Sequence, residues 1–227
     1  MNRNWAVNQD GFTIFPPMFN HGELAVIIEA LASPKLERSR AGMRHILSQP
    51  SVARIAHSPE LFDIAQIYLG NRAKPFRATL FDKSHEANWL VAWHQDTALP
   101  LRRRRDVSGW GPWSVKAGIF YAHAPASALE KILALRLHLD PSTSRNGPLR
   151  VLPGTHNRGV LTDDSIHNLA TKIRPVDCLV RQGGVIAMQP LLVHASSKSQ
   201  DPNPRRVLHI EYSATMNFAE GLELALA

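Results

Sequence analysis

Cysteine, long apolar runs and acidic side chains are scarce in this sequence. Its 227 residues include one cysteine, Cys178, which excludes an internal disulfide framework and favours a reducing compartment. No stretch approaches the roughly 20 apolar residues that span a bilayer, and the opening segment Met1–Trp5 lacks the basic-then-apolar pattern of a secretion signal. We therefore expect a cytoplasmic protein with no membrane partner.

Acidic residues number 19 against 26 Lys and Arg, which gives a formal net charge of +7 at pH 7. Such a balance favours anionic ligands. Part of the excess is the run Arg102–Arg105, which we interpret as a solvated loop; a basic rim that attracts an acidic substrate is the alternative. The sequence has neither interleaved aromatic residues nor a known nucleic-acid module, so we expect no nucleic-acid partner.

Length and hydrophobic pattern predict the architecture. With 44% hydrophobic residues the chain can build one substantial core, and we predict a single domain over residues 1–227. Apolar side chains at helical spacing predict a helix over 21–33, and a Ser-Pro start with a Gly stop predicts another over 59–69. Short strand-like segments dominate afterwards. We expect a helical N-terminal part, about residues 1–75, packed outside a mainly β barrel, about residues 76–215.

Two segments of the barrel part carry functional predictions. Residues 98–128 show little periodicity over a long stretch, as lids and binding loops do, so we predict that they cover the substrate. In the segment 132–140, leucines alternate with polar residues, which predicts a strand with leucines under the helices and Arg136 facing a lumen. A strand with its polar face in solvent is the alternative. The candidate substrate contacts are Trp110, Trp113, Lys116 and Arg136.

The strongest chemical signal is the triplet His94-Gln95-Asp96. In a β-strand, residues i and i+2 project from the same face, so this spacing sets an imidazole beside a carboxylate. With a second histidine they would form the 2-His-1-carboxylate triad that holds non-haem Fe(II) and leaves coordination positions open. Among eleven histidines we select His194, because it ends an apolar run typical of a buried strand. Arg205, which opens a β-rich segment, can pair bidentately with a carboxylate of a metal-bound ligand.

Taken in order, His94-x-Asp96, the motif Asn-Gly-x-Leu-x-x-x-Pro-Gly-Thr-His over 146–156, His194 and Arg205 resemble the phytanoyl-CoA dioxygenase family. The resemblance covers nearly the whole chain. It implies a double-stranded β-helix, the jelly-roll or cupin-like barrel. It also implies an oxygenase that uses Fe(II), 2-oxoglutarate and O₂, with ascorbate as a stimulant, in which the two histidines and Asp96 hold the iron. Because Asp96 is present, hydroxylation is implied; related halogenases lack this carboxylate.

The resemblance assigns further roles by position. Thr97 and Ser196 resemble hydroxyls that hydrogen-bond 2-oxoglutarate, and Arg205 its anchor for the distal carboxylate. Arg206 is the alternative anchor, because a one-residue register slip would exchange the two arginines. The motif that ends at His156 is structural in this family, so we do not expect that histidine to bind the metal.

We predict a dioxygenase that hydroxylates an unactivated C–H bond of a small molecule, either acidic or partly aromatic, and releases succinate and CO₂. The metal centre is the only catalytic group that we expect, and the protein would act as a monomer or homodimer. Two alternatives stay open. One is a cupin-type metal enzyme that does not use 2-oxoglutarate, against which Arg205 argues. The other is a catalytically silent binding protein on the same barrel.

Overall fold

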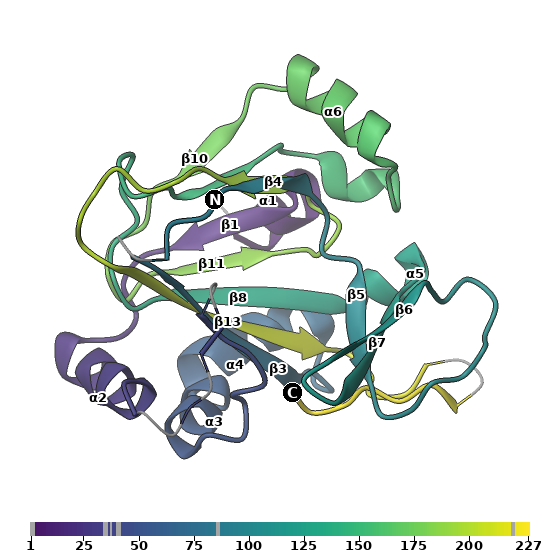
Figure 1. The fold of residues 1–227 in the computed structure, drawn as a ribbon, viewed down its shortest axis with the longest axis horizontal. Helices are drawn as coiled ribbons and strands as arrows, with labels where there is room; N and C mark the ends of the chain where they lie inside the picture. Colours follow the sequence, from purple (N-terminus) through teal and green to yellow (C-terminus); the bar gives the residue numbers. More distant parts are fainter. Residues whose placement is uncertain (1–2, 34–35, 37, 40–41, 85–86, 219–220) are drawn as a thin grey trace.

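In the computed structural model, residues 3–33, 36, 38–39, 42–84, 87–218 and 221–227 are described. Two antiparallel sheets form the body of the molecule (Figure 1). The strands of the larger sheet are β1 (Phe12–Phe15), β2 (Gly42–Met43), β3 (Lys74–Lys83), β8 (Ile132–His138), β11 (Val185–Met188) and β13 (Arg205–Ser213). Those of the smaller sheet are β4 (Val91–His94), β9 (Leu149–Val151), β10 (Val176–Cys178) and β12 (His194–Ser196). Their spatial orders are β1-β11-β8-β13-β3-β2 and β10-β9-β12-β4, which is the arrangement of a double-stranded β-helix.

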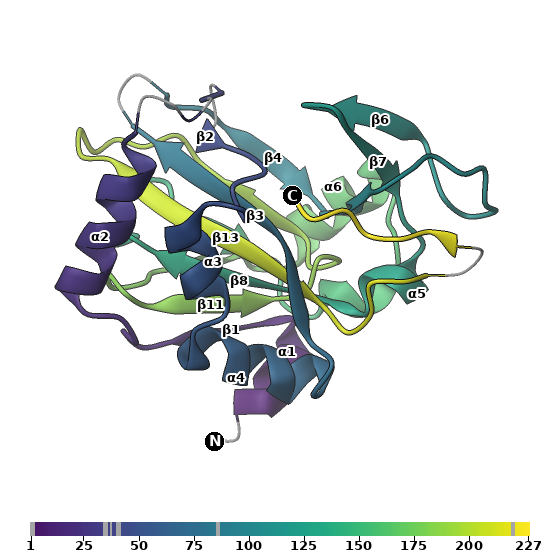
Figure 2. The same cartoon turned by 90° about the horizontal axis from the view of Figure 1, so that it is seen from below.

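Helices cover the outer face of the larger sheet (Figure 2). These are α2 (His21–Leu31), α3 (Pro50–Ala56) and α4 (Pro59–Leu69), while α1 (Arg3–Asp10) precedes β1 and α6 (Asp163–Lys172) lies outside the smaller sheet. The two predicted helices are confirmed, and α1 and α3 were not predicted. In the N-terminal part, β1 and β2 also add the two edge strands of the larger sheet. None of the helices in the described residues is long and apolar enough to cross a bilayer.

Strand β8 has two different faces, as the alternation of its leucines predicts. Leu133, Leu135 and Leu137 are buried in the core beneath the helices. Ala134 faces an apolar cluster between the two sheets, and Arg136 is 7% exposed and lines an internal cavity. A polar face in solvent is therefore excluded for this strand. Burial of each leucine contributes roughly 1.5–3 kcal/mol, which fixes the register that turns Arg136 inward.

Residues 98–128 are not the irregular lid that we expected. They form a third sheet of order β5-β7-β6 and the short helix α5 (Ala126–Leu129), at one end of the barrel (Figure 1). The strands are β5 (Ala98–Leu101), β6 (Trp113–Lys116) and β7 (Ile119–His123). A two-residue turn joins β6 to β7, with φ of 47° at Ala117 and 78° at Gly118. Such hairpin turns usually carry Asn or Asp before the glycine, so alanine there concealed the hairpin.

The C-terminal tail packs against this third sheet and completes its core. Leu222 and Leu224 are fully buried in a cluster with Leu99 and Leu101 of β5. The backbone continues the pairing, because the amide of Ala225 donates to the carbonyl of Pro100 at 3.0 Å. The tail therefore belongs to the core of the third sheet.

Candidate metal centre

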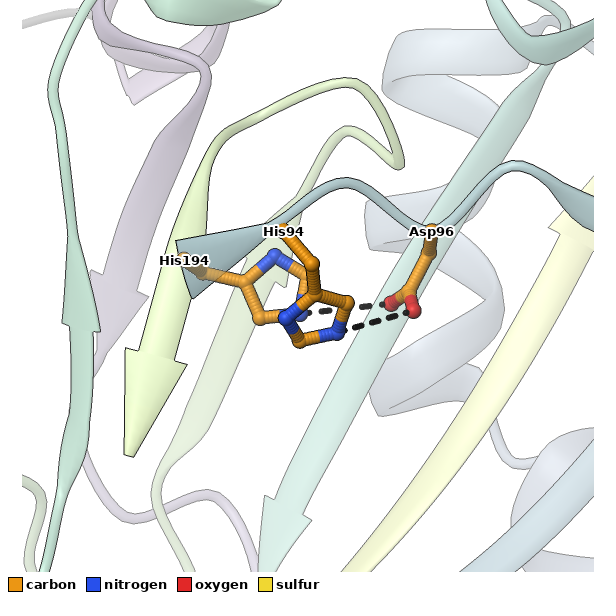
Figure 3. A group of neighbouring side chains, drawn as sticks. All are labelled: His94, Asp96 and His194. Carbon is orange, nitrogen blue, oxygen red and sulfur yellow. Dashed lines mark ion pairs between the residues drawn. The ribbon is translucent and has the colours of Figure 1, made fainter. Parts of the chain in front are cut away.

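His94, Asp96 and His194 converge between the sheets (Figure 3). Strands β4 and β12 pair so that His94 and His194 are opposite each other, with ring centroids 4.2 Å apart. The Asp96 carboxylate lies 3.6 Å from Nε2 of His94 and 3.5 Å from Nε2 of His194. Contrary to the strand assumption, β4 ends at His94. Asp96 lies in the segment that follows, where its backbone N–H donates a hydrogen bond to the carbonyl of Pro190 at 2.9 Å. The apolar run before His194 is a turn, and strand β12 begins at the histidine itself.

Both imidazoles are oriented by their own backbone. Nδ1 of His94 donates to the carbonyl of Ala92 and Nδ1 of His194 to that of Leu192, each at 2.8 Å. The proton on Nδ1 leaves the Nε2 lone pair free to bind a metal. Burial lowers the pKa of His194 to about 4. Burial acts to raise the pKa of Asp96, but the two imidazoles outweigh it and hold that pKa well below its usual range.

The donor set suits a divalent metal. Asp96 is ionised and His194 is neutral at pH 7, which are the states that coordinate metal ions. Ligand atoms of the three residues all lie within 4.8 Å of one another. Two imidazole nitrogens and one carboxylate match the triad of non-haem Fe(II) oxygenases, which leaves several positions for other ligands.

A first cavity of about 90 Å³ opens beside the triad and is lined by buried cations. Arg205 is 4% exposed and donates through Nε to the carbonyl of Asn146 at 3.1 Å. Lys83 is 1% exposed; its Nζ donates to Oγ of Ser196 at 2.8 Å and lies 5.3 Å from the ring centroid of Trp89. No carboxylate pairs with Lys83 or Arg205 within the described part of the chain. The positive charges of Lys83 and Arg205 therefore favour an anion in this cavity.

Lys83 is the functional candidate that the sequence analysis missed. Burial and the nearby Arg205 lower its pKa to about 7. It ends β3, on the face that also carries Phe81 into the first cavity. Alternation along 76–83 could have revealed this, because an inward phenylalanine at 81 implies an inward side chain at 83.

The two arginines at the start of β13 have different surroundings. Arg206 makes a bidentate pair with Asp140, at 2.7 and 2.8 Å, and lines neither cavity beside the triad. Arg136 lines the first cavity together with Arg205, and its Nη1 donates to Nδ1 of His209 at 3.0 Å. Of the predicted substrate contacts, Arg136 thus lies beside the predicted 2-oxoglutarate residues.

A second cavity of about 230 Å³ lies on the other side of Asp96. It contains Lys116 and Thr97, whose Oγ1 is hydrogen-bonded to Nδ1 of His123 at 2.6 Å. Thr97 does not line the first cavity, which argues against its predicted contact with 2-oxoglutarate. Trp110 and Trp113 line neither cavity, because they pack against the core of the third sheet.

Gln95 and His156 have structural roles. Gln95 is buried; its Nε2 donates to the carbonyls of Gly159 and Leu191, and it ties the loop and turn that flank the triad. His156 lies away from the triad, where its Nε2 is 3.1 Å from the carbonyl oxygen of Asn8. The expectation that His156 is structural agrees with this position.

A buried ion pair supports the floor of the second cavity. Arg77 of β3 and Glu211 of β13 are register partners, and the guanidinium contacts both carboxylate oxygens, one of them at 2.6 Å. Burial acts to raise the pKa of Glu211, but Arg77 outweighs it and the pKa is lowered. A carboxyl whose folded pKa lies below its unfolded value stabilises the fold above the unfolded pKa and loses that contribution as the pH falls.

Glu211→Gln should therefore destabilise the protein by about 3–5 kcal/mol at pH 7, because it leaves Arg77 buried and unpaired. Urea unfolding from pH 7 down to about pH 3 measures this, and the variant should lose less stability than wild type as the pH falls. The exposed Asp177→Gln, whose partner Arg150 is also partly exposed, is the control and should change stability by less than about 1 kcal/mol. Equal effects of the two substitutions would contradict the role given to the buried pair.

Two antiparallel sheets that enclose a His-Asp-His triad define a metal-binding double-stranded β-helix protein. The chain matches the Phytanoyl-CoA dioxygenase (PhyH) family over residues 7–207, and it belongs to that family.

Comparisons with individual proteins agree with membership of this family. The chain is 22% identical to the ectoine dioxygenase of Sphingopyxis alaskensis, over 95% of this chain and 76% of that protein. It is 24% identical to the L-proline trans-4-hydroxylase of Streptomyces griseoviridis, over 73% of this chain and 63% of that protein. Among solved structures, EctD from S. alaskensis with bound Fe superposes with a TM-score of 0.70 at 21% identity, over 93% of this chain and 75% of that one. Another structure of EctD contains 2-oxoglutarate and 5-hydroxyectoine, also with a TM-score of 0.70.

Proposed function

We propose that this protein is a non-haem Fe(II)- and 2-oxoglutarate-dependent dioxygenase that hydroxylates an unactivated C–H bond of a small, acidic molecule. One observation carries the proposal: the His-Asp-His triad lines a cavity that also holds Lys83, Arg136 and Arg205, and its Asp96 lines a second cavity. Membership of the dioxygenase family and the two hydroxylating relatives support it. The buried single cysteine, Cys178, is in keeping with a cytoplasmic setting.

When bound, iron and 2-oxoglutarate would together reduce O₂, oxidise one C–H bond of the substrate to C–OH, and release succinate and CO₂. Nε2 of His94, Nε2 of His194 and the Asp96 carboxylate would hold the metal from one side. In the first cavity, Arg205 would pair with the distal carboxylate of 2-oxoglutarate, with Lys83 and Ser196 beside it. The second cavity would hold the substrate. Its volume of about 230 Å³ suits a molecule smaller than a typical drug.

The assay that tests this proposal is succinate formation from 2-oxoglutarate in air. Iron-loaded protein should form succinate, and more of it when a substrate is present, whereas Asp96→Ala should form none. A cupin-type enzyme without 2-oxoglutarate, or a silent binding protein, predicts bound iron with no succinate in every condition. That result would refute the proposal.

Lys83 gives the proposed 2-oxoglutarate site a distinctive pH dependence. Its pKa of about 7 means that the free protein loses this positive charge just above neutrality. Binding of a dicarboxylate favours the charged form, so the affinity for 2-oxoglutarate should fall as the pH rises above about 7. Lys83→Met should weaken binding about tenfold at pH 6 and flatten the dependence. Anaerobic titration with 2-oxoglutarate at several pH values measures this, and the exposed Lys172→Met is the control. If the affinity of Lys83→Met changes with pH as steeply as that of wild type, Lys83 does not have this role.

A further inference from the structure

Two basic side chains reach the second cavity from separate sheets. Arg44 follows β2, at the edge of the larger sheet, and Lys116 ends β6, at the edge of the third sheet. Nζ of Lys116 lies 4.8 Å from the ring centroid of Tyr121, whose hydroxyl is hydrogen-bonded to Nε2 of His45 at 2.7 Å. Among the residues that the structure describes, no carboxylate forms an ion pair with Arg44 or Lys116.

The other charged groups of this cavity have partners of their own. Arg77 is paired with Glu211, and Asp96 lies between the two triad histidines. Arg44 and Lys116 therefore contribute two positive charges that form no ion pair with a carboxylate of the described residues. Burial lowers the pKa of Lys116, and the charges of Arg44 and Arg77 lower it further, although Asp96 acts in the opposite direction. The three cations therefore repel one another. A bound anion would relieve that repulsion.

Resting on the proposed function, we propose that Arg44 and Lys116 bind the carboxylate of the substrate and thereby select small carboxylic acids. The guanidinium can pair with a carboxylate bidentately, and the ammonium adds a second charged donor. The acid would be held at the mouth between the two sheets, because Arg44 is exposed and Lys116 half-buried. Asp96 lines the same cavity, so the rest of the molecule would extend toward the triad.

Matched pairs of ligands test this selection without turnover. Anaerobic iron-loaded protein with saturating 2-oxoglutarate, which occupies the first cavity, is mixed with a panel of amino acids, 2-hydroxy acids and benzoic acids. Each acid is compared with its carboxamide, and the rise in melting temperature with ligand concentration gives the dissociation constant. At least one acid should bind about tenfold or more tightly than its amide, and Arg44→Gln or Lys116→Gln should remove that preference.

The exposed Arg103→Gln is the matched control, because Arg103 lies in the basic run 102–105 but lines neither cavity. It should keep the preference for acids. Loss of the preference in Arg103→Gln alone, acids and amides that bind equally, or a panel in which nothing binds would overturn the inference. The affinity of each variant for 2-oxoglutarate separates the two proposals. Acid selection without any 2-oxoglutarate complex would refute the proposed function only, and a normal complex without acid selection would refute the inference only.

Discussion

Asp96→Ala should abolish iron binding while the protein still unfolds cooperatively. Asp96 is the single carboxylate of the triad, and it lies within 3.6 Å of both imidazole Nε2 atoms. Structural zinc sites with four protein ligands bind with about 10–16 kcal/mol, so an equal share for one ligand is about 2.5–4 kcal/mol, or roughly 70- to 900-fold in affinity. The Asp96 side chain is 32% exposed and packs in no apolar cluster, so the fold should tolerate alanine.

Metal analysis after anaerobic loading and desalting measures this effect, with urea unfolding as the test of folding. His94→Ala should behave in the same way. His156→Gln serves as the matched control, since this histidine is buried away from the triad, and it should retain full iron occupancy. Stoichiometric iron in Asp96→Ala would show that another set of residues binds the metal.

Arg205→Ala should weaken 2-oxoglutarate binding by about 2–5 kcal/mol, which is roughly 30- to 5,000-fold, without loss of iron. The buried guanidinium faces a cavity where no carboxylate of the described residues neutralises it. Truncation would leave one end of the bound dicarboxylate without its bidentate partner.

Arg206→Ala provides a control at the adjacent position. Arg206 is already paired with Asp140, so its loss should cost some stability and leave 2-oxoglutarate affinity within about threefold of wild type. Titrations of both variants under anaerobic conditions measure the difference. A large loss in Arg206→Ala and none in Arg205→Ala would reverse the assignment of the two residues.

The triad could be predicted from the sequence, because one part of it is a short local motif and the other part follows from the pairing of two strands. His94 and Asp96 are two residues apart in an extended segment, and His194 is brought to them by the pairing of two strands. The alternation in 132–140 likewise fixed the inward face of β8, because leucines on one side leave Arg136 on the other. The choice between Arg205 and Arg206 rested on spacing and family pattern, and their different partners support it.

What the sequence did not reveal depends on contacts between distant segments. In the sequence Lys83 is an ordinary lysine at the end of a strand. Only the fold brings Ser196 and Arg205 next to it. We expected Trp110 and Trp113 to contact the substrate, but both pack against the core of the third sheet. The C-terminal tail also contributes to that core. Arg44 lies in a segment without periodicity, and only the fold sets it across from Lys116.

The most direct test of the central claim is anaerobic titration of the iron-loaded protein with 2-oxoglutarate. Chelation of Fe(II) by a 2-keto acid produces a weak visible charge-transfer band. We predict a saturable band in wild type that is absent in Asp96→Ala and shifted to higher 2-oxoglutarate concentration in Arg205→Ala. Stoichiometrically bound iron that gives no band at any 2-oxoglutarate concentration would contradict the account.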